Sequence, residues 1–140
     1  MKCIEEIKMV ISKIGGKEII DASITEENTV LFSVMLADKQ TNFLLILNES
    51  EKIAIINLVY TFKQGYQNLG LDFYEILENS NRNLIMGYLN LLEDNGVKRI
   101  SYKSTYAGDL TNFLGNNSFE NFLLVSIDMV GISIDTLGVN

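Results

Sequence analysis

Three short runs of strand-like residues, joined by brief polar connections, constrain the fold of this chain more than any other feature. The runs are Glu18–Ile24, Thr29–Leu36 and Asn42–Leu47. Strands separated by so few residues are expected to pair as antiparallel neighbours. The third run is apolar at both sets of alternating positions, which indicates a central or doubly covered strand. The sequence therefore predicts a three-stranded antiparallel meander.

An amphipathic helix is predicted ahead of this meander, over Lys2–Ile14. Isoleucines recur there at intervals of three and four residues, which places them on one helix face: Ile4, Ile7, Ile11 and Ile14. Acidic residues near the start and a lysine near the end suit the helix dipole. Gly15 and Gly16 indicate the end of the helix instead of a phosphate-binding loop, because the glycines of such a loop precede a helix.

The stretch from Asn48 to Gly96 is predicted to supply two or three central helices. Asn48 with Glu51 and Asp72 with Glu75 have capping-box spacing, so helices are expected over residues 48–64 and 72–78. A further helix is predicted over residues 84–93, with Asn95-Gly96 after its end. The run 53–62 is apolar nearly all round and rich in β-branched residues, so a strand remains the alternative there.

Strands are predicted again near the C-terminus. Val97–Lys103 alternates, and Phe119–Met129 is expected to pair with Ile132–Thr136 through a turn at residues 130–131. A terminal helix capped by Ser118 is the alternative for this hairpin. Ala107–Leu114 is interpreted as one short helix.

Together these elements predict one α+β domain over residues 1–140. Its expected layout is an N-terminal helix, a three-stranded antiparallel meander, two to three central helices and C-terminal strands. The order helix, three-strand meander, helix resembles the layout of acidic dimeric secretion chaperones, although no sequence motif accompanies it.

The composition excludes several kinds of chemistry. The chain has no histidine, which removes histidine-dependent nucleophilic catalysis and histidine-containing metal sites. Its single cysteine, Cys3, allows neither an intrachain disulfide nor a thiolate zinc site, and it is interpreted as structural. No metal or cofactor is therefore expected. No signal peptide or membrane span is predicted either, so a cytoplasmic location is expected.

The net charge of −7 bears on partners. Such a chain repels phosphate backbones and anionic lipid, so neither nucleic acid nor a membrane is expected to bind it. A protein partner is expected to be basic instead. The large apolar fraction leaves a homodimer open.

One segment, residues 97–106, concentrates basic and aromatic side chains. Arginine and lysine bind phosphate or carboxylate, and tyrosine stacks on a base or sugar. The predicted ligand-binding residues are Lys98, Arg99, Tyr102, Lys103 and Tyr106. The alternative is a solvated strand edge, where lysines discourage aggregation.

Three tyrosines near the predicted central helices, Tyr60, Tyr66 and Tyr74, are candidates for a partner-binding face, because tyrosine is enriched in interfaces. The alternative is ordinary half-buried core. Acidic pairs such as Glu75 and Glu78 are interpreted as solvated surface, and no catalytic residue is assigned. A carboxylate-based hydrolase stays open, with Asp128 and Asp135 on the predicted hairpin as a weaker candidate pair.

The leading hypothesis from the sequence is a non-enzymatic protein-interaction module. It would bind a partner protein and inhibit, neutralise or escort it, as immunity proteins, anti-defence inhibitors and chaperones do. The alternative is a small-ligand binder that holds an anionic, nucleotide-like molecule at residues 97–106.

Overall fold

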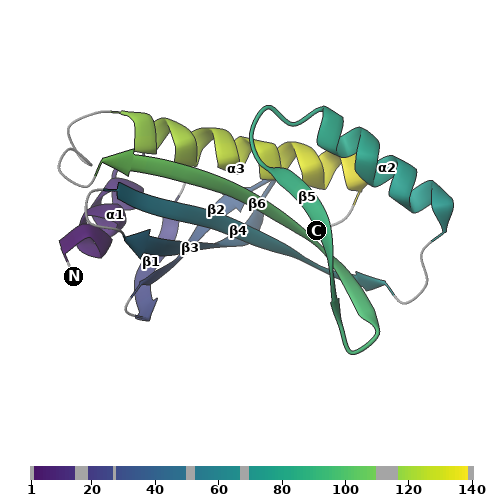
Figure 1. Cartoon of the computed structure of the whole chain (residues 1–140), viewed down its shortest axis with the longest axis horizontal. Helices are drawn as coiled ribbons and strands as arrows, with labels where there is room; N and C mark the ends of the chain where they lie inside the picture. Colours follow the sequence, from purple (N-terminus) through teal and green to yellow (C-terminus); the bar gives the residue numbers. More distant parts are fainter. Residues whose placement is uncertain are drawn as a thin grey trace.

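A computed structural model describes residues 2–14, 19–26, 28–49, 53–66, 70–109 and 117–138. The described residues form a six-stranded antiparallel sheet in the order β1-β2-β3-β4-β6-β5, together with three helices (Figure 1). The elements in chain order are α1 (Lys2–Ser12), β1 (Ile19–Glu26), β2 (Thr29–Leu36), β3 (Lys39–Glu49), β4 (Ile53–Tyr66), α2 (Leu71–Arg82), β5 (Tyr88–Asp94), β6 (Val97–Asp109) and α3 (Ser118–Leu137).

The N-terminal half agrees with the sequence in its first four elements. The predicted helix and the three predicted strands are confirmed as α1, β1, β2 and β3, and the strands pair as antiparallel neighbours. The isoleucine face of α1 is buried, as its spacing predicts. Strand β3 is central in the sheet, in agreement with its apolar character on both faces. The predicted cap at Gly15-Gly16 lies outside the described residues.

From Asn48 onward the predicted helix over residues 72–78 and the predicted strand Val97–Lys103 are confirmed within α2 and β6. The predicted layout is nevertheless wrong there, because the first expected central helix is the fourteen-residue strand β4. Its buried positions alternate with period two, at Ala54, Ile56, Leu58, Tyr60 and Phe62. β4 pairs with β3 on one side and with β6 on the other. The β-branched, all-round apolar run therefore belongs to an interior strand, which was the alternative for this stretch.

The helix predicted over residues 84–93 is also wrong, because this segment contains strand β5. Asn95 and Gly96 have φ angles of 52° and 79°, and Asp94 pairs with Val97 across them. Two central residues with positive φ make the tight hairpin turn that matches strand twist. The Asn-Gly pair therefore joins two strands and does not end a helix. Gly87, expected inside the helix, has a φ of 76° just before β5.

The predicted C-terminal hairpin is wrong as well, since residues 118–137 form the single helix α3. Residues Val130 and Gly131, the expected turn, lie inside it. One side of this helix buries large apolar side chains against the sheet, including Phe119, Leu123 and Ile127. Burial against a sheet outweighs the local period-two pattern. The expected short helix at 107–114 is replaced over residues 107–109 by the end of β6, and its remainder lies outside the described ranges.

All the described helix packing is on one face of the sheet. α1 packs against β1 and β2 and touches α3, α3 packs on β6, and α2 packs against α3 and β5 (Figure 1). Beneath them an aromatic ladder crosses the sheet, with ring centroids 5.0–5.6 Å apart from Phe32 through Phe43 and Tyr60 to Phe62. No described helix covers the opposite side, which we call the open face. None of the described helices is long and apolar enough to cross a membrane.

Candidate functional site

The open face carries one continuous row of directly opposed side chains across five strands. Leu31 of β2 pairs with Leu44 of β3, which pairs with Val59 of β4. The row continues through Lys103 of β6 to Tyr88 of β5. We call these five residues the open-face row. Directly opposed side chains in a sheet lie within contact distance, so the row forms a continuous strip.

Further aliphatic side chains widen this strip. Ile46 lies beside Leu44 on the same face of β3, and Ile55 lies on β4 beyond it. Leu31 and Ile55 are 38% and 39% exposed, and Tyr88 and Leu92 of β5 are each 47% exposed. The water-facing side of an antiparallel sheet is normally polar, so exposed or partly exposed leucine, isoleucine and valine on adjacent strands are typical of an interaction surface.

Polar side chains beside the strip form hydrogen bonds with one another. The Ser33 hydroxyl donates to Asn42 Oδ1 over 2.6 Å, and the Gln40 amide donates to the same hydroxyl over 3.3 Å. Thr105 donates to Asn57 Oδ1 over 2.7 Å from the neighbouring strand. These bonds hold side chains in fixed orientations across strand pairs, so the surface around the aliphatic strip is preorganised.

The structure does not bring the five predicted ligand-binding residues together. They all lie on β6, whose side chains alternate between the two faces of the sheet. Arg99 and Lys103 lie on the open face, opposite Leu92 and Tyr88 of β5. The other three, Lys98, Tyr102 and Tyr106, lie on the helix-covered face.

The three covered residues are engaged in packing. Tyr102 is fully buried and donates its hydroxyl to the Met86 carbonyl over 2.8 Å, and burial raises its pKa. The Tyr106 ring packs against Phe119 and Phe122 at centroid distances of 5.3 and 5.5 Å, and burial also raises its pKa. Lys98 Nζ donates to the Tyr74 hydroxyl over 3.3 Å.

The three predicted partner-binding tyrosines occupy different environments. Tyr60 is 4% exposed inside the aromatic ladder. The Tyr66 ring packs at a tilt against Phe73 with centroids 4.9 Å apart, and burial raises the pKa of Tyr66 as it does that of Tyr60. Tyr74 is 42% exposed on α2. They do not form a common surface.

Sequence reasoning missed Tyr88 and the aliphatic residues of the open-face row. Tyr88 falls within the helix predicted over residues 84–93, whereas it lies on the strand β5. The Asn95-Gly96 pair was the signal that could have identified it. A two-residue hairpin turn pairs Asp94 with Val97, and counting back along both strands sets Tyr88 opposite Lys103.

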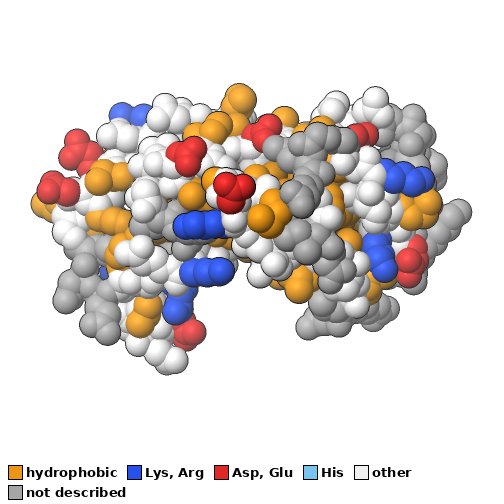
Figure 2. Space-filling view, turned by 180° about the vertical axis from the view of Figure 1, so that it is seen from behind, with side chains coloured by type: hydrophobic (Ala, Val, Ile, Leu, Met, Phe, Trp, Pro, Cys, Tyr) orange, Lys and Arg blue, Asp and Glu red, His pale blue; other side chains and the backbone are white. Residues whose placement is uncertain are grey.

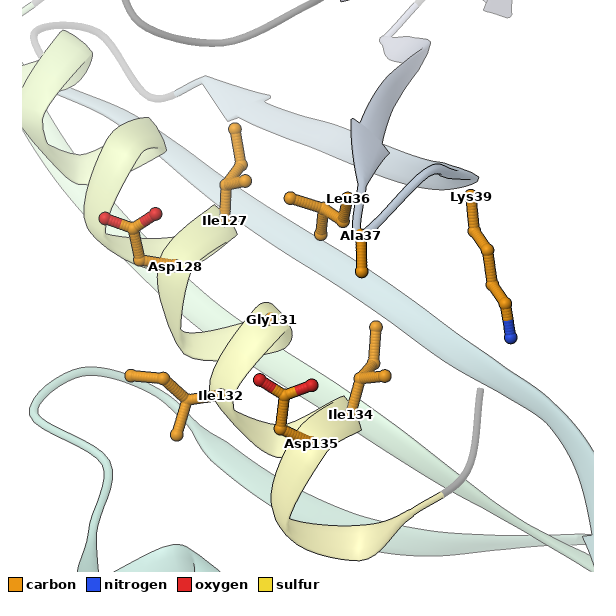
Figure 3. A pocket seen from close by; sticks show the side chains of 9 residues that line it. All are labelled: Leu36, Ala37, Lys39, Ile127, Asp128, Gly131, Ile132, Ile134 and Asp135. Atoms are coloured by element: carbon orange, nitrogen blue, oxygen red, sulfur yellow. The ribbon is translucent and has the colours of Figure 1, made fainter.

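A separate cavity of about 570 Å³ lies between α3 and the turn that joins β2 to β3. Figure 3 shows the side chains that line it: Leu36, Ala37, Lys39, Ile127, Asp128, Gly131, Ile132, Ile134 and Asp135. Asp128 and Asp135 therefore lie on one helix, two turns apart, and not on a hairpin. The lining is mainly aliphatic, with a lysine and two carboxylates, so it suits an apolar group with a polar end.

Within the described ranges, no cluster of three or more acidic or cysteine side chains could hold a metal ion. The open face has apolar side chains in the middle and hydrogen-bonded polar side chains beside them, an arrangement that protein interfaces also have. No protein-family model matches this chain, and no curated protein matches it significantly.

Proposed function

We propose that this chain is a non-enzymatic protein-interaction module that binds a partner protein through the open face of its sheet. By occupying that face it would inhibit, neutralise or escort the partner. The observation that carries this proposal is the open-face row, in which Leu31, Leu44 and Val59 lie side by side on three adjacent strands with no described helix above them. Such a strip gains free energy when a partner removes it from water, by about 25 cal/mol per Å² of apolar surface.

The shape of the molecule is consistent with this use. In Figure 1, α2 and α3 run along the upper side of the molecule, and most of the strands lie below them. The helices lie on the other side of the sheet, so a partner can approach the row without displacing them.

The experiment that tests the function is site-specific photo-crosslinking in cells that express the chain natively. A photoreactive phenylalanine analogue at Ile55 is expected to capture one protein in stoichiometric amount. The matched control places it at Ile132 of α3, which is 43% exposed, against 39% for Ile55, but lies in the helix layer. Equal capture at both positions, or none at Ile55, would contradict the proposal. A crosslinked product of twice the chain mass identifies a homodimer.

A further inference from the structure

Charge is distributed unevenly between the two sides of the molecule. The three helices contain eight acidic and three basic residues. On β4, β5 and β6, the described charged side chains at open-face positions are Lys63, Arg99, Lys103 and one carboxylate, that of Asp94 at the hairpin tip. In Figure 2 most acidic side chains lie in the upper half, where α2 and α3 run, and most basic ones lie below them. The net charge of the chain therefore has the opposite sign to this part of the open face.

We propose that the partner contacts the open face through an acidic, amphipathic peptide segment whose carboxylates pair with Arg99 and Lys103. This inference rests on the proposed function and specifies the chemistry of the partner. It also reverses the expectation of a basic partner, because that expectation follows from the total charge, whereas the described charged side chains at open-face positions of β4, β5 and β6 are mostly basic. Complementary charge is the usual device by which an interface selects its partner.

The spacing of the two cations defines the segment. Arg99 and Lys103 are four residues apart on one strand, which corresponds to about 13 Å. An extended segment with carboxylates four residues apart has the same spacing, as does a helix with carboxylates about two turns apart. Both cations are only partly exposed. A partner carboxylate therefore meets them in a less screened environment than free solution.

Apolar contacts lie beside each cation. Tyr88 is directly opposite Lys103, and Leu92 is directly opposite Arg99, on the neighbouring strand β5. Between them Ser101 is 3% exposed. The site thus combines two charges with two apolar side chains in a fixed pattern, and a segment that alternates acidic and apolar residues is complementary to it.

The same observations favour a protein segment over a nucleic acid. Lys103 lies directly opposite Val59, next to Leu44 in the open-face row, and these aliphatic side chains offer nothing to a phosphate backbone. The acidic helices repel a long polyanion, which extends beyond the two cations. A short acidic segment interacts mainly with the two nearby cations, because salt screens the more distant charges.

The experiment is selection of peptides from a displayed random dodecapeptide library by the full chain. Selected peptides are expected to be rich in Asp and Glu alternating with apolar residues, and to bind at least about tenfold more weakly to the double variant Arg99→Glu, Lys103→Glu. The matched control is Lys8→Glu, Lys13→Glu, the same charge change in and beside α1, which is expected to leave binding within about twofold. Circular dichroism checks that the double variant is folded. If charge reversal disturbs the fold, the milder pair Arg99→Gln, Lys103→Gln repeats the test.

The outcomes separate this inference from the proposed function. Neutral or basic peptides whose binding is lost in Leu44→Asp would overturn the acidic segment and leave the open face as the binding surface. Acidic peptides that bind the double variant as tightly as the native chain would overturn the role of the two cations. A labelled single-stranded oligonucleotide that competes at Arg99 and Lys103 would overturn the partner class. Selection of no peptide, together with no photo-crosslinked protein at Ile55, would overturn both proposals.

Discussion

The two faces of the same strands differ in what their side chains do. On the covered face, Phe32, Phe43 and Tyr60 stack under the helices and are almost fully buried. On the open face, their sequence neighbours Leu31, Leu44 and Val59 are aliphatic and partly exposed. Aromatic rings fill the space under the helices, whereas the aliphatic side chains of the open face are less buried. Under the proposed function, neighbouring residues of each strand therefore serve stability on one face and binding on the other.

The largest expected effect tests this separation with two adjacent residues. Phe43→Ala removes a fully buried ring and is expected to lower the free energy of unfolding by about 3–5 kcal/mol. Leu44→Ala, on the open face, is expected to cost at most about 1.5 kcal/mol, because less surface is uncovered. Urea denaturation of both variants measures the difference. Equal losses would show that the open face is part of the core and would contradict the comparison.

The next effect concerns the outer edge of strand β5. The Asn81 side chain accepts a hydrogen bond from Leu89 N–H over 2.6 Å and donates one to the Leu89 carbonyl over 2.9 Å. Asn81→Ala leaves both backbone groups of this buried residue unpaired, so we expect a loss of about 1–3 kcal/mol and faster hydrogen exchange at the Leu89 amide. Asn90→Ala, on the exposed face of the same strand, is the control. Unchanged exchange at Leu89 would show that Asn81 does not protect this edge.

A smaller pair of opposite effects is expected at two glycines. Gly96→Ala forces a side chain into the hairpin turn at a φ of 79° and is expected to cost about 1–2 kcal/mol. Gly131→Ala, in the middle of α3 with open space around it, is expected to stabilise by about 0.5–1 kcal/mol. Thermal unfolding reports both. If Gly131→Ala destabilised the chain, residues 130–131 would behave as the turn that the sequence predicted.

The smallest effect at neutral pH, and a growing one at alkaline pH, is expected from Tyr102 of the covered face. Burial raises its pKa in the folded state above the usual 10.0. The folded chain therefore retains the phenolic proton more strongly than the unfolded chain does. This contribution to stability is complete below about pH 10 and is lost as the pH rises through the folded-state pKa.

Tyr102→Phe tests this dependence. The variant loses the hydrogen bond to Met86, so it is expected to be less stable by about 1 kcal/mol at neutral pH. Its stability is expected to fall less steeply above about pH 10, because one buried phenol no longer titrates. Urea denaturation at a series of alkaline pH values measures how steeply the free energy of unfolding falls with pH in the native chain and in the variant. Parallel curves would show that Tyr102 is ionised as readily in the folded as in the unfolded chain.

Local pattern predicted the elements of the N-terminal part and was misleading where pairing is long-range. The isoleucine spacing of α1 and the brief turns between β1, β2 and β3 depend on neighbours in sequence. β4 depends on β6, more than thirty residues further along the chain, through pairs such as Tyr60 with Tyr102. An all-round apolar run is compatible with a helix or an interior strand, and only its partners on both sides decide between them.

The candidate site illustrates the same limit. Residues 97–106 are basic and aromatic as the sequence indicates, but a strand sends neighbouring side chains to opposite faces. Arg99 and Lys103 lie on the same face of β6, about 13 Å apart, while Tyr102 between them belongs to the core. The aromatic side chain beside them is Tyr88, which the helix predicted over residues 84–93 placed elsewhere.

By itself, the sequence determined the amphipathic first helix, the antiparallel meander and the exclusion of histidine-dependent chemistry, since these follow from spacing and composition. The tertiary structure alone decided that the helices pack on one face and that Arg99 and Lys103 lie on the other. The physical reason is that β3 and β4 are apolar on both faces, so local pattern does not say which face a helix covers. The packing of α1 and α3 resolves that choice and leaves the second face without a described helix above it.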